Sequence, residues 1–279
     1  MAETNPSAAK SPASLPAALD RLEEIFRQVQ GKEPAVFLDY DGTLTPIVSR
    51  PEDAVLAPEM RRVVQELARH CTVAVISGRD LKDVQNLVGL ESLVYAGSHG
   101  FDIAGPQRRQ IEHQAGQDFL PPLDRAEKAL RDRLEGKIPG VQVERKKFSI
   151  AVHYRRVAEG KVREVEDAVD QVQKETGRLR QTSGKKIFEL QPDIDWHKGK
   201  ALLWLLENLG LSRPEVLPFY LGDDVTDEDA FKVLKDRGIG IAVQEKPTAT
   251  AARYRLRDPD EVKQFLQALT VYVRENAHE

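Results

Sequence analysis

The sequence predicts an α/β protein with a parallel sheet covered by helices on both faces and interrupted by an α+β insertion. Short apolar runs alternate with helical segments over residues 35–103, and the same alternation resumes at residue 198. Strands that alternate with helices indicate a parallel sheet. Between these stretches the chain changes to helices combined with hairpin-like strands. We therefore expect a core formed by residues 15–103 and 192–279, and an inserted cap domain formed by residues 104–191.

The first part of the chain contains the elements of half the core. Residues 1–14 are small, polar and proline-containing, which predicts a disordered tail. Residues 15–30 have apolar side chains at helical spacing. The following strands are expected at 35–39, 72–76 and 93–96, with helices near 58–70 and 80–88.

The insertion and the second half of the core follow. In the insertion we expect helices at 118–135 and 159–176, a hairpin of strands 141–144 and 149–154, and short strands near 179–181 and 186–190. After residue 198 we expect helices at 198–209, 227–235 and 259–269, and strands at 218–221, 239–243 and 254–256.

The bulk composition excludes several classes of protein. The 279 residues have 41 basic and 45 acidic side chains, so the net charge of -4 gives no nucleic-acid footprint. No apolar run approaches the roughly 20 residues that span a bilayer, and no secretory signal pattern is visible. Cys71 is the single cysteine, which excludes an internal disulfide and fits a reducing compartment. These observations predict a cytoplasmic protein that binds neither nucleic acid nor membrane.

The most informative segment is Asp39-Tyr40-Asp41-Gly42-Thr43, directly after an apolar run. In an extended backbone alternate side chains share a face, so Asp39 and Asp41 can point into one pocket. Carboxylates that close repel each other unless a cation or a proton lies between them. One of the two can then accept a group covalently while the other acts as acid and base.

Other polar residues also follow predicted strands. Ser77 follows the second strand, Gly97 to Gly100 the third, and Asp223 and Asp224 the strand that ends at residue 221. In open parallel sheets ligands bind beyond the carboxyl ends of the strands. The sequence therefore predicts that these residues gather at one edge of the sheet.

This set of residues suits phosphoryl transfer, which depends on positioning and on neutralising charge. Asp39 is the candidate acceptor, and Asp41 could protonate the departing alkoxide and then deprotonate water. Mg²⁺ prefers oxygen ligands, and Asp39 and Asp223 are the first choices, with Asp224 and Asp227 as direct or indirect supports. Ser77 and Lys198 would hold the phosphoryl oxygens, because a hydroxyl donor and an ammonium group stabilise the charge that develops on them.

The motifs Asp39-Tyr40-Asp41-Gly42-Thr43, Ser77-Gly78-Arg79, Lys198-Gly199 and Gly222 to Asp227 resemble the four ordered motifs of the haloacid dehalogenase superfamily. Further segments resemble trehalose-6-phosphate phosphatases, over roughly residues 34–270: Leu44 to Ile47, Ala96 to Gly100, Glu144 to Lys146, His153 to Arg155, Lys185 with Glu189, and Gly222 to Phe231. The resemblance implies a Rossmann-like core with a C2-type cap between the second and third motifs.

The resemblance also implies roles. It makes Asp39 the nucleophile, Asp41 the acid and base, and Ser77 and Lys198 the phosphoryl-binding pair. Mg²⁺ would be held by Asp39, the backbone carbonyl of Asp41, and Asp223, with Asp224 alongside. The implied substrate-binding residues are Gly78, Arg79, His99, Glu144, Lys146, Arg155, Lys185 and Glu189. The implied reaction is hydrolysis of trehalose 6-phosphate through an aspartyl-phosphate, with a functional link to a trehalose-6-phosphate synthase.

Alternatives stay open at this point. Phosphatases of sucrose 6-phosphate or glucosyl-glycerol phosphate share the same motifs. A phosphate-accepting signalling domain and a catalytically silent partner of a sugar synthase are further possibilities. Helix capping alone could explain Asp224 and Asp227, because acidic residues favour a helix N-terminus. The charged run from Glu144 to Lys147 also fits a simple exposed hairpin.

Overall fold

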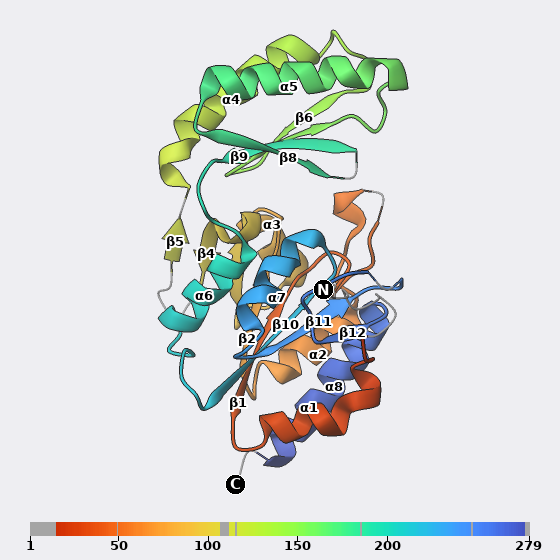
Figure 1. The fold of residues 1–279 in the computed structure, drawn as a ribbon, viewed down its shortest axis with the longest axis vertical. Helices are drawn as coiled ribbons and strands as arrows, with labels where there is room; N and C mark the ends of the chain where they lie inside the picture. Colours follow the sequence, from red (N-terminus) through yellow and green to blue (C-terminus); the bar gives the residue numbers. More distant parts are fainter. Residues whose placement is uncertain are drawn as a thin grey trace, which may run out of the picture.

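The protein is described by a computed structural model over residues 15–48, 50–106, 112–114, 116–184, 186–246 and 248–276. Two sheets, one large and one small, lie one above the other along the long axis of the molecule (Figure 1). The predicted disordered tail, residues 1–14, lies outside the described residues. Within the described part of the chain, none of the helices combines the length and hydrophobicity that a bilayer-spanning segment requires.

The large sheet has eight strands among the described residues, in the order β12-β11-β10-β1-β2-β3-β4-β5. The strands from β12 to β3 are parallel, and β4 and β5 are antiparallel additions at one edge. Their bounds are β1 (Glu33–Leu38), β2 (Thr72–Ile76), β3 (Val94–Gly97), β4 (Asp102–Ala104), β5 (Glu112–Gln114), β10 (Val216–Gly222), β11 (Ile239–Val243) and β12 (Tyr254–Leu256).

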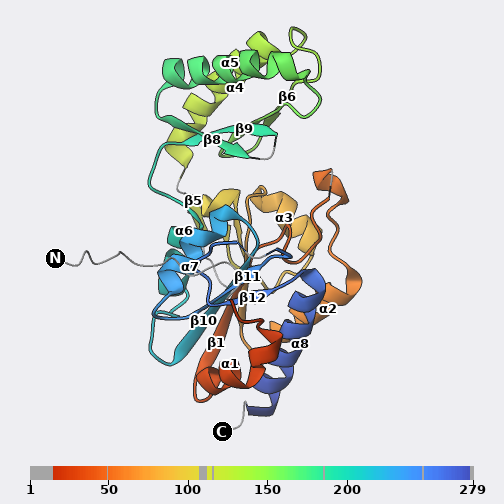
Figure 2. The same ribbon diagram turned by 45° about the vertical axis from the view of Figure 1, so that its right-hand side comes forward.

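Helices cover both faces of this sheet (Figure 2). On one face, Val36 and Leu38 of β1 pack with α1 (Leu22–Val29), α2 (Pro58–Leu67), α3 (Leu81–Val88) and α8 (Pro259–Asn276). On the other face, Ala35 and Phe37 pack with α6 (Lys198–Asn208) and α7 (Glu228–Leu234). Because successive strand residues point to opposite faces, a strand that is apolar throughout stabilises both layers. Each fully buried large side chain contributes about 1.5–3 kcal/mol.

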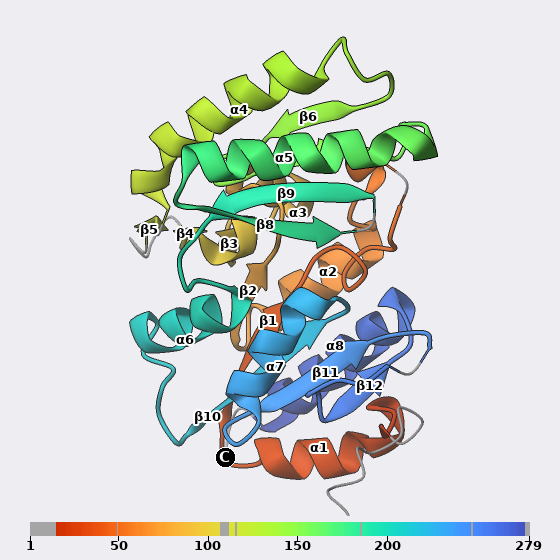
Figure 3. The same cartoon turned by 45° about the horizontal axis from the view of Figure 1, so that its top comes forward.

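The small sheet is antiparallel, in the order β6-β7-β9-β8, and lies between its own two helices and the large sheet (Figures 1 and 3). Val143, Ile150, Val152, Phe188 and Leu190 share the face that packs on the helices. The opposite face therefore points toward the large sheet. The elements are β6 (Gln142–Arg145), β7 (Ile150–His153), β8 (Leu179–Gly184), β9 (Ile187–Pro192), α4 (Leu120–Leu134) and α5 (Val162–Thr176).

The α/β fold class is confirmed, but several elements differ from the prediction. β5 at Glu112–Gln114 pairs with β4, so the large sheet extends beyond residue 103, into the range expected for the insertion. The sequence Glu112-His113-Gln114 contains no apolar residue, so no strand pattern was visible there. The first helix begins later than expected, because the backbone at Pro16 and Ala18 bonds to Arg255 of β12. Helix α8 continues to Asn276, beyond the expected end at residue 269, because Thr270 and Val273 are buried in the core.

Candidate active site

The candidate site lies where β1 and β10 end side by side. These two strands lie at the point where the order of the sheet reverses, since the chain proceeds from β1 to β2 on one side and β10 leads to β11 on the other. Asp39 follows β1 and Asp223 follows β10, and the ligand atoms of Asp39, Asp223 and Asp227 all lie within 4.8 Å of one another. Such a reversal places a crevice at the carboxyl ends of the strands.

A tight turn after β1 brings the chain close to Asp223. Backbone bonds from Leu44 and Thr45 to the carbonyl of Tyr40 close this turn, with distances of 2.9 and 3.1 Å. Gly42 has φ +80° there, and a Cβ added to it would lie 2.0 Å from Oδ2 of Asp223. A side chain at residue 42 would therefore displace the carboxylate, so the glycine of the motif is required for steric reasons.

Lys198 is bonded to two of the three acids. It is 3% exposed at the start of α6, and its Nζ donates to Oδ1 of Asp39 and to Oδ1 of Asp227, each at 2.7 Å. Burial alone would lower the pKa of Lys198, but the charges of Asp227 and Asp39 outweigh it and raise the pKa. The lysine is therefore a fixed cation in the floor of the site.

Asp227 is more central than the sequence suggested. It is completely buried, and its Oδ1 also accepts the hydroxyl proton of Tyr220 at 2.6 Å, while its Oδ2 accepts the backbone N–H of Asp224 at 3.0 Å. Both oxygens are thus engaged, and one of them orients Lys198. The sequence analysis gave Asp227 only as a support of the metal within the motif Gly222 to Asp227, and helix capping was the alternative explanation.

Asp224 does not join the gathered carboxylates. Its side chain is exposed, and Oδ1 accepts the backbone N–H of Val225 at 2.7 Å. Asp224 and Asp227 together form a capping box at the turn Val225–Asp227. Both residues therefore cap this turn, and of the two Asp227 also accepts a bond from Lys198.

The acids are crowded enough to suit a divalent cation. Burial, followed by the neighbouring acids, raises the pKa of Asp223 to about 7, and burial likewise raises the pKa of Asp39 despite the opposing charge of Lys198. Three carboxylates face one ammonium group, which leaves an excess of negative charge. Since both oxygens of Asp227 have partners, Asp39 and Asp223 are the residues that fit a magnesium ligand role.

Asp41 is held by Arg79. The guanidinium donates from Nε to Oδ2 and from Nη2 to Oδ1 of Asp41, each at 2.7 Å, in a two-pronged ion pair. Arg79 is itself anchored by Asp83 at 3.0 Å and by the carbonyl of Pro51 at 2.9 Å. The arginine predicted to bind substrate therefore fixes the orientation of the candidate acid and base.

Ser77 and His99 form the wall beside Asp39. Ser77 is buried, and its Oγ accepts the backbone N–H of Arg79 at 3.1 Å. The backbone N–H of His99 donates to the carbonyl of Ser77 at 2.8 Å, and its ring lies against Gly78, where an added Cβ would come within 2.8 Å of Cε1. Burial, aided by Lys198 and Lys146, lowers the pKa of His99 to about 4, so the imidazole is neutral at pH 7.

The small sheet presents charged side chains toward this wall. Glu144 and Glu189 pair with the same residue of β7, Ala151, and therefore share the face opposite to the helices. Oε1 of Glu189 accepts from Ser149 at 2.6 Å and lies 3.6 Å from Nζ of Lys146. Although burial opposes it, these contacts lower the pKa of Glu189, so this carboxylate stays ionised.

Glu144 has a partner on the same face. Its Oε2 lies 2.7 Å from Nε2 of His153, and this hydrogen bond lowers the pKa of Glu144. Arg145, one residue on, points to the other face, where it pairs with Asp124 and Glu127 of α4. Arg155 is exposed beyond the end of β7, and Lys185 lies outside the described residues.

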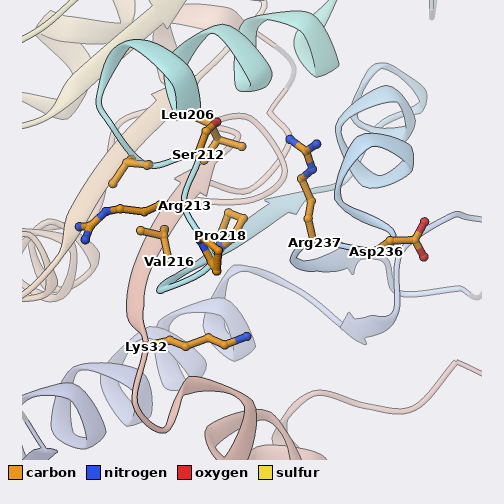
Figure 4. A pocket seen from close by; sticks show the side chains of 10 residues that line it. Lys32, Leu206, Ser212, Arg213, Val216, Pro218, Asp236 and Arg237 are labelled. Carbon is orange, nitrogen blue, oxygen red and sulfur yellow. The ribbon is translucent and has the colours of Figure 1, made fainter.

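Cavities lie near both ends of the parallel strands. One, of about 630 Å³, opens beside Asp223 and Gly42 and is bounded by Gln244 and Arg257. The other, of about 550 Å³, lies near the amino ends of β1 and β10, where Lys32, Val216 and Pro218 line it (Figure 4). Only the first adjoins the gathered acids, so the second is remote from the candidate site.

The parallel α/β core and the carboxylates gathered at the ends of β1 and β10 are those of a phosphatase. A family model described as trehalose-phosphatase matches residues 37–260. Probable trehalose-phosphate phosphatase H of Arabidopsis thaliana is 46% identical over 268 residues, which cover 91% of this chain and 76% of that protein. Trehalose 6-phosphate phosphatase RA3 of Zea mays is 44% identical over 269 residues, covering 91% and 74%. The chain belongs to the trehalose-phosphatase family.

Solved structures agree with this fold. The C-terminal domain of C. albicans trehalose-6-phosphate phosphatase superposes with a TM-score of 0.74 at 23% identity, covering 92% of this chain and 98% of that one. Aspergillus fumigatus trehalose-6-phosphate phosphatase, in its crystal form 3, gives a TM-score of 0.66 at 26% identity, covering 92% and 99%. The similarity spans both sheets, because nearly the whole of each chain is matched.

Proposed function

We propose that this protein hydrolyses trehalose 6-phosphate to trehalose and phosphate through an aspartyl-phosphate on Asp39. The observation that carries the proposal is the meeting of Asp39, Asp223 and Lys198 below the charged face of the small sheet. The names of the similar proteins support the same reaction and the same sugar. We also propose that the small sheet and its two helices act as a cap on the large sheet, within the expected cap range of residues 104–191.

The chemistry would proceed in two displacements. In the first, an oxygen of Asp39 forms a bond to phosphorus, the phosphorus–oxygen bond to the sugar breaks, and Asp41 gives a proton to the departing alkoxide. In the second, Asp41 takes a proton from water, the water oxygen bonds to phosphorus, and the carboxylate of Asp39 is released. Lys198 and Ser77 would stabilise the charge on the transferred oxygens.

Magnesium would be held by the carboxylates of Asp39 and Asp223 and by the backbone carbonyl of Asp41. When bound, the ion supplies positive charge that draws the phosphoryl group toward Asp39 and offsets the repulsion between the acids. Lys198 keeps its own role, because Asp227 fixes its ammonium group at 2.7 Å. We propose Asp224 as a structural residue that caps the turn.

The cap would recognise the sugar. A disaccharide offers many hydroxyl groups, and ionised side chains form strong hydrogen bonds with them. Glu144, Lys146 and Glu189 lie on one face of the small sheet and suit this task, and neutral His99 could donate or accept a bond beneath them. Arg155 and Lys185 remain predicted contacts of the sugar.

The test is phosphate release from a panel of sugar phosphates in the presence and absence of Mg²⁺. We expect trehalose 6-phosphate to be preferred over glucose 6-phosphate, sucrose 6-phosphate and glucosyl-glycerol phosphate, and chelation to abolish turnover. Asp39→Asn should lose activity by at least about a thousandfold, as expected when the covalent step is removed. Equal release by wild type and Asp39→Asn would show that Asp39 is not the nucleophile.

The same panel decides between the alternatives. A preference for another disaccharide phosphate would reassign the sugar but keep the reaction. A stable phosphoenzyme without turnover would favour a signalling role, and complete inactivity would favour a silent partner of a synthase. A cytoplasmic location and a functional link to a trehalose-6-phosphate synthase stay predictions.

A further inference from the structure

The tip of the β6–β7 hairpin, residues 146–149, joins the small sheet to the loops of the candidate site. The backbone N–H of Lys147 donates to both carboxylate oxygens of Asp80, at 3.1 and 3.0 Å. Its ammonium group donates to Oδ2 of Asp102, at 2.5 Å. One residue of the hairpin tip is therefore bonded to two acids of the large-sheet unit.

Asp102 depends on this contact. Its side chain is 6% exposed, whereas that of Lys147 is 39% exposed. An ionised carboxylate that is removed from water requires a partner, and losing the partner costs more than the pair contributes. The partner that the structure gives Asp102 comes from the small sheet, so the position of the hairpin tip is coupled to a buried charge.

The side chain of Asp80 does not cap its own helix. It occupies the N-cap position of α3, where an aspartate normally accepts a backbone N–H of its own helix, but its side chain makes no such bond. It instead accepts from Oγ of Ser98 at 2.9 Å and from the N–H of Lys147. The carboxylate therefore ties the hairpin tip to the loop that leads into His99.

Aromatic packing supports the same contact. Phe148 stacks on Phe101 with ring centroids 6.0 Å apart, and both side chains are almost completely buried. A Cβ added to Gly116 would lie 2.4 Å from the ring of Phe148, so the chain approaches the pair closely. The hairpin tip thus packs against Asp80, Phe101 and Asp102 of the large-sheet unit, which together we call the seat.

The seat borders residues that would contact substrate on both sides. Asp80 follows Arg79, whose carbonyl accepts the N–H of Ser98 at 2.6 Å, and Ser98 precedes His99. On the hairpin, Lys146 immediately precedes Lys147 and reaches toward Glu189. The position of the tip therefore determines how the charged face of the small sheet stands relative to Ser77 and His99.

We propose that Lys147 is a positioning residue that acts through Asp80 and Asp102 to hold the cap at the distance needed to bind the sugar. It controls capture of the sugar half of the substrate and leaves the reaction at phosphorus unaffected. The proposal rests on the proposed function for the identity of the substrate only.

The first experiment compares Lys147→Met with wild type on trehalose 6-phosphate and on p-nitrophenyl phosphate, which has no sugar. We expect kcat/KM for the sugar phosphate to fall about tenfold to a hundredfold, mainly through KM, because a buried charge loses its partner. Turnover of the aryl phosphate should change by less than about twofold. The matched control is Lys161→Met, a cap lysine that is 55% exposed and pairs with Glu164; it should behave as wild type. Equal losses on both substrates, or no loss, would overturn the proposal.

The second experiment separates positioning from stability. Adding Asp102→Asn to Lys147→Met removes the unpaired buried charge, so the midpoint of thermal unfolding should recover. The KM for the sugar phosphate should stay raised, because the tip still lacks its side-chain bond to residue 102 and keeps only the backbone bonds to Asp80. Recovery of KM together with the thermal midpoint would mean that Lys147 is only a structural residue.

The third experiment does not depend on substrate. Amide hydrogen exchange over residues 98–102 and 146–149 should accelerate about tenfold in Lys147→Met and remain unchanged in Lys161→Met, since local opening costs less when the seat is weakened. Unchanged exchange would overturn the proposal even if the enzyme acted on a different sugar. Absence of trehalose 6-phosphate hydrolysis by wild type would count against the proposed function alone.

Discussion

Replacing Asp227 with asparagine tests whether this residue holds Lys198 or serves only as a helix cap. The amide keeps the size of the side chain but has one acceptor oxygen in place of two. If that oxygen faces Lys198 and Tyr220, the new NH₂ group faces the backbone N–H of Asp224, which is also a donor. The reverse orientation turns the NH₂ group toward the ammonium of Lys198. Either way, a buried donor loses its partner.

The magnitude follows from burial. Asp227 is 0% exposed and Lys198 3% exposed, and removing one partner from such a pair costs about 3–5 kcal/mol. For a chain of this length we expect the midpoint of thermal unfolding to fall by about 6–10 °C. Because the ammonium group would also lose its fixed position, kcat should fall about 10²–10³-fold, as when one preorganised donor is removed.

The assay combines thermal unfolding with phosphate release at saturating Mg²⁺, at a temperature where the variant is folded. The control is Asp229→Asn, also from α7, whose side chain is 39% exposed and 3.4 Å from Lys232. Its loss should stay below about 1 kcal/mol. A variant of Asp227 with lower stability but unchanged kcat would reduce the residue to a helix cap. Unchanged stability and kcat would refute the reasoning altogether.

Three further predictions concern charge. The pKa of Asp223 is raised to about 7, so a proton competes with the metal below that pH, and calorimetry should show Mg²⁺ affinity falling as pH decreases from 8 to 6. Arg79→Met should lower kcat about tenfold to a hundredfold with little change in KM, because Asp41 loses its orientation; a rise in KM alone would restore the substrate-binding role. Burial raises the pKa of Cys71 to about 12, so the folded protein should resist thiol reagents at pH 8 and react once unfolded.

The sequence predicted the fold well where the strands formed clear apolar runs. The parallel strands β1, β2, β3, β10 and β11 were expected within a few residues, because fully buried strands appear as apolar runs. Its failures were local. β5 contains no apolar residue and β4 only Ile103 and Ala104, so neither segment showed a strand pattern. The last helix was expected to end at residue 269, but α8 continues to Asn276 because Thr270 and Val273 are buried in the core.

The site was predicted in part for similar reasons. Positions after strand ends indicated Asp39, Ser77 and Asp223, since chain topology brings such positions together. The partners of long side chains were beyond reach, because they depend on three-dimensional contacts. Arg79 pairs with Asp41, and Asp227 accepts a bond from Lys198, whereas Asp224 faces solvent. Alternation along β6 was the one pattern that separated Glu144 from Arg145, and it was visible in the sequence.

The pairing of β1 with β10 has a consequence for how the chain is made. Leu38 lies beside Leu221, so a strand that leaves the ribosome early waits for one that is translated after some 180 further residues. During that interval its hydrogen-bonding edge and apolar surface are open to other nascent chains. The small sheet, whose strands are close in sequence, has time to fold first. We therefore expect chaperone dependence to be concentrated in the larger unit, and truncated products that stop before residue 216 to aggregate rather than retain partial activity.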